Sequence, residues 1–339
     1  MGLGFFAARR FGTAIFVLFG VSLITFILAH SISGDPITAW LGRSASLHPE
    51  LVKFYIEKYH LSAPLYEQYF FYVYGLLQGN LGYSPFWDEP VVVLLGRTVP
   101  YTLQLMFFTF LFTIIMGILM GVLGAKFANR WPDALIRAFY LLGTAAPAFF
   151  LALALIVVFA FILHILPTGG TVDPTIIVSP QVTGFPMLDS LINGNWASVG
   201  SQVQHIILPS LANSIGIFGV ITRVLRSSIL DTLSSNYIRT ARAKGASENA
   251  VFFKHALRNS LIPVVTLLAV MVNVCIVSSI FVEYIFAYPG VGDFAVEAVL
   301  NYDYPSILGT TLLFGLMIVI ANFVADVLYA VADPRIRLT

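Results

Sequence analysis

Charged residues are scarce in this sequence. Only 10% of its 339 residues are Asp, Glu, Lys or Arg, whereas soluble domains carry roughly 25%. Hydrophobic residues make up 58% of the chain, and a water-soluble fold would leave much of that apolar surface exposed. The formal net charge of +1 gives no bulk attraction for nucleic acid. The composition excludes a soluble domain and indicates a membrane protein.

Motifs of catalytic and energy-converting proteins are missing as well. The sequence has no phosphate-binding loop of the form GxxxxGK[ST], no zincin motif and no Cys/His cluster. Its single cysteine, Cys275, lies in an apolar run, so we expect a small buried side chain and no internal disulfide. We expect a protein that is not an enzyme and holds no metal. Its energy must come from another chain or from an ion gradient.

Long windows without charge identify six candidate membrane spans. A Lys, Arg or Asp at the centre of a spanning helix costs about 2.5–3.5 kcal/mol, and a span needs about 20 residues. The windows are residues 11–29, 98–125, 138–172, 190–222, 259–282 and 304–325. The first is longer than the roughly 7–15 apolar residues of a signal peptide, so we expect a retained span. A further window, 68–87, soon loses its apolar character and is expected to lie at the interface.

Positive charge is distributed unequally between the loops. With the N-terminus in the cytoplasm, fourteen of the 18 Lys and Arg residues fall on inside segments. The other four, Arg43, Lys53, Lys58 and Arg97, fall outside. This positive-inside bias predicts a multi-pass protein of the plasma or inner membrane with both termini in the cytoplasm. Outside, residues 46–61 have helical apolar spacing and predict an amphipathic helix.

Ionisable residues are almost absent from the six windows. Proton-coupled transporters place Asp, Glu or His inside their spans, so ion coupling is disfavoured, while a passive pore is not. Polar residues at plausible mid-depth include Asn213, Ser214, Asn273 and Ser278. Such groups usually bind helices to one another. Lining a transport pathway is the more specific alternative for the same four residues.

A basic insert, residues 223–258, separates the fourth and fifth windows. Gly245 is expected to divide it into two short helices, with Ser247 as the N-cap of the second and Glu248 in its first turn. Small residues gather at the tip of this predicted knuckle, namely Ala241, Ala243, Gly245 and Ala246. The insert could rest on anionic lipid or dock a cytoplasmic partner. The small tip favours docking, because it allows another surface to approach closely.

The insert resembles the cytoplasmic EAA loop of ABC importer permeases, in the version of the dipeptide/oligopeptide permease family. Gly245 and Ala241 take the glycine and the second alanine of the pattern E-A-A-x-x-x-G, while Arg239 and Thr240 replace its first two residues. Other family-like motifs follow in order: SGDP (33–36), GNLGYS (79–84), RTVPYTLQL (97–105), LPTGG (166–170), HIILPSL (205–211), EYIFAYPGVG (283–292), NYDYPSILG (301–309) and ADPRIR (332–337). The series is similar to the family's first permease subunit from end to end.

This resemblance implies an all-α polytopic membrane protein with the type I ABC importer transmembrane fold. An N-terminal span (1–30) would precede an external region (31–97), a five-helix core (98–333) and a cytoplasmic tail (334–339). The implied partners are a second homologous permease, two ATP-hydrolysing subunits, an extracellular solute-binding protein and membrane lipid. ATP and magnesium would bind to the ATPase subunits, and this chain would hold no cofactor.

The resemblance also implies roles for particular residues. The residues expected to contact an ATPase are Arg239, Thr240, Ala241, Lys244, Gly245, Ala246 and Ser247. External loops 169–204 and 283–304 would meet the binding protein, with Glu283, Pro289, Gly290 and Asp293 as gate or contact residues. The expected cargo is a dipeptide or oligopeptide. Oligosaccharides, nickel or another solute are alternatives within the same architecture, and a passive channel or secondary transporter is the alternative outside it.

Overall fold

The computed structural model describes residues 3–33, 50, 53, 56–57 and 62–332. Nearly all regular structure within them is helical. The elements are α1 (Leu3–Ser33), α4 (Leu65–Leu77), β1 (Tyr83–Ser84), β2 (Glu89–Pro90), α5 (Val91–Lys126), α6 (Trp131–Ala145), α7 (Ala148–Leu155), η2 (Ile156–Ile162), α8 (Pro186–Ile192), α9 (Trp196–Leu233), α10 (Asn236–Ala243), η3 (Ala250–Leu257), α11 (Arg258–Ser260), α12 (Ile262–Ile285), α13 (Val291–Leu300) and α14 (Tyr304–Ala332). Most of the predicted external helix 46–61 and the tail 334–339 lie outside the described residues.

Among the described residues, four helices are long and apolar enough to cross a membrane. They are α5, α9, the continuous helix Ala250–Ile285 formed by η3, α11 and α12, and Tyr304–Asp326 of α14. The bent pair of α6 and α7 with η2 gives a fifth if it crosses as one span. The described apolar part of α1 covers Gly12–Leu28. The helical polytopic fold is confirmed, but the count of six spans is not.

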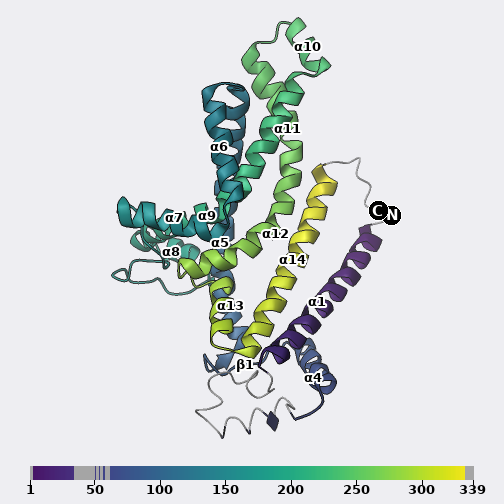
Figure 1. Ribbon diagram of the computed structural model, residues 1–339, viewed down its shortest axis with the longest axis vertical. Coiled ribbons are helices and arrows are strands. Elements are labelled where there is room, and N and C mark those ends of the chain that lie inside the picture. Colours follow the sequence, from purple (N-terminus) through teal and green to yellow (C-terminus); the bar gives the residue numbers. More distant parts are fainter. Residues whose placement is uncertain (1–2, 34–49, 51–52, 54–55, 58–61, 333–339) are drawn as a thin grey trace.

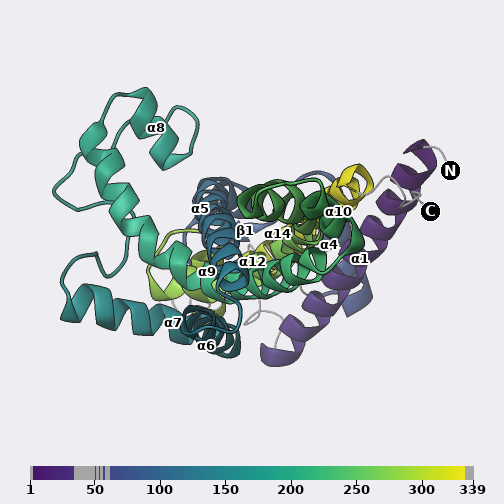
Figure 2. The ribbon, with the colours of Figure 1, turned by 90° about the horizontal axis from the view of Figure 1, so that it is seen from above.

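The third predicted span, residues 138–172, is not one straight helix. The chain bends by 114° between α6 and α7, and Figure 2 shows α7 leading away from α6. Pro147 precedes α7, and Ala146 before it is extended with ψ 133°. A proline ring disfavours helical backbone in the residue before it, which explains the bend. The prediction found the apolar run but missed this break.

Two other helices extend beyond the ends of the spans that the sequence predicts. α5 begins at Val91 rather than at residue 98, and α9 continues to Leu233, past the predicted end at 222. α9 therefore extends beyond the apolar window into the basic insert. Figure 1 shows α10 at one end of the molecule, with α4 and β1 at the opposite end. The predicted interfacial segment 68–87 forms part of α4 and the short β1 strand and is not a long helix.

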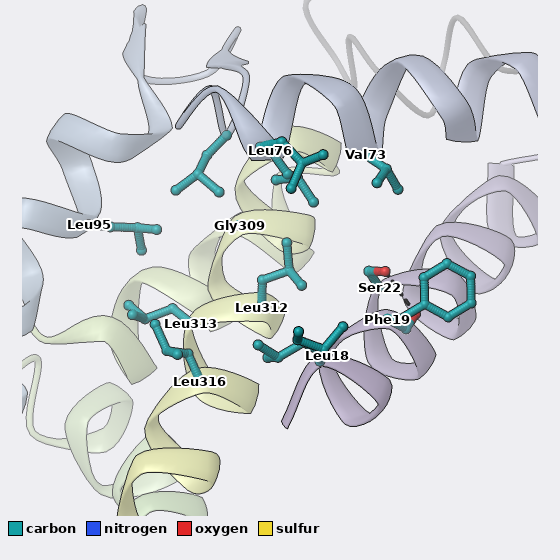
Figure 3. A pocket seen from close by; sticks show the side chains of 13 residues that line it. Leu18, Phe19, Ser22, Val73, Leu76, Leu95, Gly309, Leu312, Leu313 and Leu316 are labelled. Carbon is teal, nitrogen blue, oxygen red and sulfur yellow. Dashed lines mark hydrogen bonds between the residues drawn. The ribbon is translucent and has the colours of Figure 1, made fainter. Parts of the chain in front are cut away.

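The N-terminal helix α1 packs against α14, and α4 lies across their ends (Figure 1). An apolar pocket of about 440 Å³ lies among α1, α4, α5 and α14. Figure 3 shows Leu18 of α1, Leu76 of α4 and Leu312 of α14 at its wall. Its one polar side chain, Ser22, donates to the Phe19 carbonyl oxygen at 2.8 Å. The first and last predicted spans are therefore neighbours.

Glycines bring α5 close to α9 in the centre of the fold. A Cβ atom on Gly117 would lie 2.7 Å from Cγ2 of Ile221, and one on Gly121 would lie 2.9 Å from Cβ of Leu225. Both partners on α9 are fully buried. Small residues at a helix contact allow two backbones to approach closely, which is a common packing mode in membranes. This contact fixes α9, and α9 carries the basic insert.

Replacing Gly121 with valine is expected to destabilise the protein by about 1–3 kcal/mol, because the added side chain overpacks a filled helix contact. The thermal midpoint of the purified protein in detergent would measure this loss. The matched control is Gly96→Ala in the same helix, where the new Cβ has no neighbour within 4 Å apart from its chain neighbours and the nearby backbone of the helix itself. Equal midpoints for the two variants would contradict the close-packing account.

Candidate functional site

The basic insert forms a knuckle at the end of the molecule. α10 ends at Ala243, and Gly245 follows with φ 81°, a left-handed conformation that glycine adopts without a Cβ penalty. The backbone N–H of Ala250 donates to the Ser247 side-chain oxygen at 3.3 Å, which caps the second helix. The structure therefore confirms the predicted order of a first helix, a turn at Gly245 and a second helix capped by Ser247.

A small core holds the two helices of the knuckle together. Ile238 of α10 and Val251 and Ala256 of η3 are fully buried against one another. Leu233, at the end of α9, packs against this cluster. The Asn259 side chain also donates to the Tyr237 hydroxyl oxygen at 2.9 Å. The knuckle is therefore a packed unit joined directly to the spanning helices on both sides.

An ion pair closes the turn at Gly245. Arg242 donates from Nε to Oε1 of Glu248 at 2.8 Å and from Nη2 to Oε2 at 3.1 Å. The Arg242 hydrogen bonds hold the pKa of the Glu248 carboxyl below its usual value. The sequence analysis placed Glu248 only as a favourable charge in a first helical turn. Glu248 is the only acid in residues 236–263, and this was the available signal for the partner.

The residues predicted to contact an ATPase line the outer side of the knuckle. Exposed members of the set are Arg239, Thr240, Lys244, Gly245 and Ser247, while Ala241 and Ala246 are partly exposed. Apart from Gly245 and its two neighbours in sequence, no atom of the described chain lies within 4 Å of the position that a Cβ on Gly245 would occupy. The tip therefore offers open surface on this chain. Its contact with an ATPase stays a prediction.

Two of the four pathway candidates contact each other between α9 and α12. Ser278 donates to the Asn213 side-chain oxygen, and Asn213 donates from Nδ2 to Sγ of Cys275 at 3.4 Å. Cys275 is fully buried, as the sequence predicted, and Asn213 is buried beside it. Within this chain these groups bind two helices together. Their role in lining a pathway stays a prediction.

The other two pathway candidates also make contacts in the helices. Asn273 of α12 donates from Nδ2 to Oδ1 of Asn322 in α14 at 2.6 Å. Ser214 is fully buried and donates to the Leu211 carbonyl oxygen one turn earlier in α9. The four candidates therefore do not converge on one surface. Asn213 and Ser278 connect α9 with α12, Asn273 connects α12 with α14, and Ser214 bonds only within α9.

The predicted external contact residues divide into a buried pair and a more exposed pair. Glu283 is fully buried, and its Oε2 accepts from the Gly292 backbone N–H at 2.6 Å. A Cβ on Gly290 would overlap the same carboxylate. Glu283 and Gly290 are therefore buried in this structure, and their role as gate or contact residues stays a prediction. Their burial fixes the start of α13.

Pro289 and Asp293 are partly exposed beside that pair. Asp293 lies in the first turn of α13, outside the spanning helices. Burial raises the pKa of its carboxyl to about 6, and nearby Glu297 adds to the rise. These two residues can still meet a partner at this end of the molecule.

Motifs that are distant in the sequence also contact one another away from the knuckle. The hydroxyl of Ser84 donates to the Asp303 carboxylate, and both side chains are buried. The Gly170 N–H donates to the Phe286 carbonyl oxygen at 2.7 Å. The sequence analysis quoted the segments around these residues as motifs but assigned them no contact. Neither their spacing nor their composition identifies the partners.

Within the described residues, no group of three or more His, Cys, Asp or Glu side chains is arranged to hold a metal ion.

Comparison with known proteins identifies two family regions that together cover most of the chain. Residues 113–338 match the family model described as "Binding-protein-dependent transport system inner membrane component". Residues 3–106 match the N-terminal region of the corresponding membrane component. The chain is thus a multi-pass membrane protein that matches an inner membrane component of a transport system. Its helical fold fits the type I ABC importer membrane fold.

Curated relatives match over nearly the whole length of both chains. A probable D,D-dipeptide transport system permease of Escherichia coli (strain K12) is 38% identical over 95% of this chain and 94% of its own. A di/tripeptide transport system permease of Pseudomonas aeruginosa (strain UCBPP-PA14) is 37% identical over 98% of each. An oligopeptide transport system permease of Bacillus subtilis (strain 168) is 35% identical over 97% and 98%. The chain therefore belongs to the family of binding-protein-dependent transport system inner membrane components.

Proposed function

We propose that this chain is the permease subunit of an ATP-driven importer of dipeptides and oligopeptides. The observation that carries the proposal is the end-to-end similarity to relatives named as permeases of D,D-dipeptide, di/tripeptide and oligopeptide transport systems. A second homologous permease would complete the translocation pathway. The chain itself is non-catalytic, and two partner subunits bind ATP and magnesium.

The knuckle is the proposed seat of one ATPase subunit. A coupling element must be stiff, must project from the membrane and must fit its partner closely. The buried core of Ile238 and Val251 supplies the stiffness, and the open surface around Gly245 supplies the fit. Closure of the ATPases would push on the knuckle and rock the spans between two access states, a rigid-body transition.

The orientation we propose places the knuckle and both termini in the cytoplasm. It is supported by the excess of Lys and Arg on the segments assigned inside. The solute-binding protein would then meet the opposite end, at the loop of residues 169–204 and at Pro289 and Asp293. Glu283 and Gly290 would hold that surface in shape from within.

Uptake by the assembled importer tests this function. The complete importer is reconstituted in liposomes, with this chain, the second permease, the ATPases and the binding protein. ATP is supplied on the side of the membrane where the ATPases lie. We expect ATP-dependent uptake of a labelled dipeptide, with competition from unlabelled dipeptides and oligopeptides. If only an oligosaccharide or nickel competes with the labelled dipeptide, that solute and not a peptide would be assigned as the cargo. Gradient-driven uptake by this chain alone would contradict the importer assignment.

A further inference from the structure

A buried ion pair joins two spanning segments near the knuckle. Asp133 lies in the first turn of α6 and is fully buried. Its Oδ1 accepts from Nε of Arg226 in α9 at 2.6 Å, and its Oδ2 accepts from Nη2 at 2.8 Å. The Arg226 side chain is itself only 17% exposed. Such two-pronged pairing fixes both distance and direction between two helices.

The turn between α5 and α6 is built around this carboxylate. Asn129 has φ 62°, and its backbone N–H donates to Oδ2 of Asp133 at 3.0 Å. Gly124 leaves room for the arginine, because a Cβ there would lie 3.2 Å from Cδ of Arg226. Arg137 approaches the same carboxylate at 3.6 Å, but from α6 itself and with 44% of its side chain exposed. Of these two arginines, Arg226 alone connects α6 to another helix.

Both helices that carry the knuckle touch this turn. Arg226 belongs to α9, which leads directly into α10. On the returning side, Nζ of Lys126, the last residue of α5, lies 5.9 Å from the ring centroid of Phe253 in η3. A push on either side of the knuckle therefore reaches the α5–α6 turn through a direct contact.

α6 can pass such a displacement onward to the bent pair. It packs closely on α9, with the Phe139 and Phe218 rings stacked at 6.0 Å. A Cβ on Gly219 would lie 2.9 Å from Cγ2 of Thr144. Beyond Ala145 the chain turns by 114° into α7. Packed contacts of this kind transmit displacement because protein interiors have low compressibility.

We propose that Asp133 and Arg226 are positioning residues for the coupling of ATP hydrolysis to transport. The pair ties α6 to α9, so that displacement of the knuckle also moves the bent α6–α7 segment. This inference rests on the proposed docking of an ATPase at the knuckle. Without the tie, α9 moves alone, and the assembled complex hydrolyses ATP with less transport for each ATP consumed.

The test variant removes the tie without leaving an unpaired buried charge. Asp133→Asn keeps an acceptor for the Asn129 N–H, and Arg226→Met keeps the apolar stem of the arginine. Replacing a buried ion pair by neutral groups of similar volume is often tolerated, whereas removing one partner is not. The double variant D133N/R226M therefore separates coupling from assembly. Arg137→Met is the matched control, since it removes an arginine near the same carboxylate and leaves the tie to α9.

The ratio of peptide transported to ATP hydrolysed is measured in the reconstituted importer. We expect D133N/R226M to assemble, to hydrolyse ATP within about twofold of wild type, and to lower the ratio about tenfold, within the usual range of coupling between sites. R137M should keep the wild-type ratio. A wild-type ratio in D133N/R226M would overturn the inference.

Two further variants keep the test decisive. If D133N/R226M does not assemble, Arg226→Lys retains the charge but loses the two-pronged geometry. A ratio lowered several-fold in R226K supports the tie, and an unchanged ratio overturns it. Gly245→Trp reports separately on the knuckle. If G245W transports normally, the docking proposal fails whatever the pair variants show.

Discussion

Gly245→Trp is expected to lower peptide uptake by about 100-fold. Coupling free energies between sites are usually about 1–3 kcal/mol, or about 5–150-fold, so this loss is near the upper end of that range. Gly245 has φ 81° and open space around it. The Cβ of the new side chain would meet open space, so we expect the indole ring to project into the surface proposed to seat the ATPase. We expect an intact permease pair whose ATPases no longer drive transport. Uptake and ATP hydrolysis of the reconstituted complex measure this directly.

A matched glycine separates partner contact from backbone strain. Gly79 has φ 77°, and apart from its two neighbours in sequence no atom of the described chain lies within 4 Å of a Cβ placed there. It follows α4, at the end opposite the knuckle (Figure 1). Gly79→Trp carries a similar backbone penalty and should retain most of the uptake. Equal loss of uptake in the two variants would show that strain, not docking, explains the effect.

Glu283→Ala is expected to destabilise the protein by roughly 3 kcal/mol, from an orphaned buried donor together with a cavity. The Oε2 atom of Glu283 accepts from the Gly292 N–H at 2.6 Å in a fully buried site. Alanine leaves that N–H without its acceptor and leaves space beside Gly290. The start of α13 would then lose its anchor on α12. The thermal midpoint of the purified chain in detergent would fall by several degrees.

Glu283→Gln is the control for this prediction. Its side-chain oxygen can still accept from Gly292, and its volume is close to that of glutamate. We expect Gln to retain most of the stability that Ala loses. Thr102 supports the same loop from α5, accepting from the Val291 N–H at 2.8 Å, and it is unchanged in both variants. Indistinguishable midpoints for Ala and Gln would refute the anchoring role.

The knuckle could be predicted from the sequence because local chemistry determines it. A glycine between two short amphipathic segments, followed by a serine cap, specifies a helix–turn–helix without information from the rest of the chain. The same holds for the apolar runs that became α5, α12 and α14. These features depend on neighbours in sequence, which composition and spacing report.

Helix ends were less predictable because charge marks the edge of hydrocarbon and not the end of a helix. Arg223 and Arg226 both lie inside α9, and Arg97 lies inside α5. Long cationic side chains reach polar surroundings from helix ends, so a helix can continue past them. Windows that stopped at the first charge were therefore too short. The bend at Pro147 was missed because this proline lies inside a long apolar run that predicts one span.

Tertiary partners were not predictable at all. Asp133 and Arg226 are 93 residues apart, and Ser84 and Asp303 are 219 apart. Glu283 stood beside a Pro-Gly turn, where an acid usually points to solvent, yet its acceptor site faces a backbone N–H of α13. A single sequence carries no signal for such pairings. They emerge only when the helices are packed.

Cross-linking from the knuckle tests the central claim most directly. Because the chain's one cysteine, Cys275, is buried, Lys244→Cys would supply the accessible thiol for a short photoreactive cross-linker. Gln78→Cys, at an exposed position after α4, is the control. We predict that the thiol at position 244 cross-links to an ATPase subunit in the assembled importer and that the thiol at 78 does not. Cross-linking of position 244 to lipid alone would contradict the account.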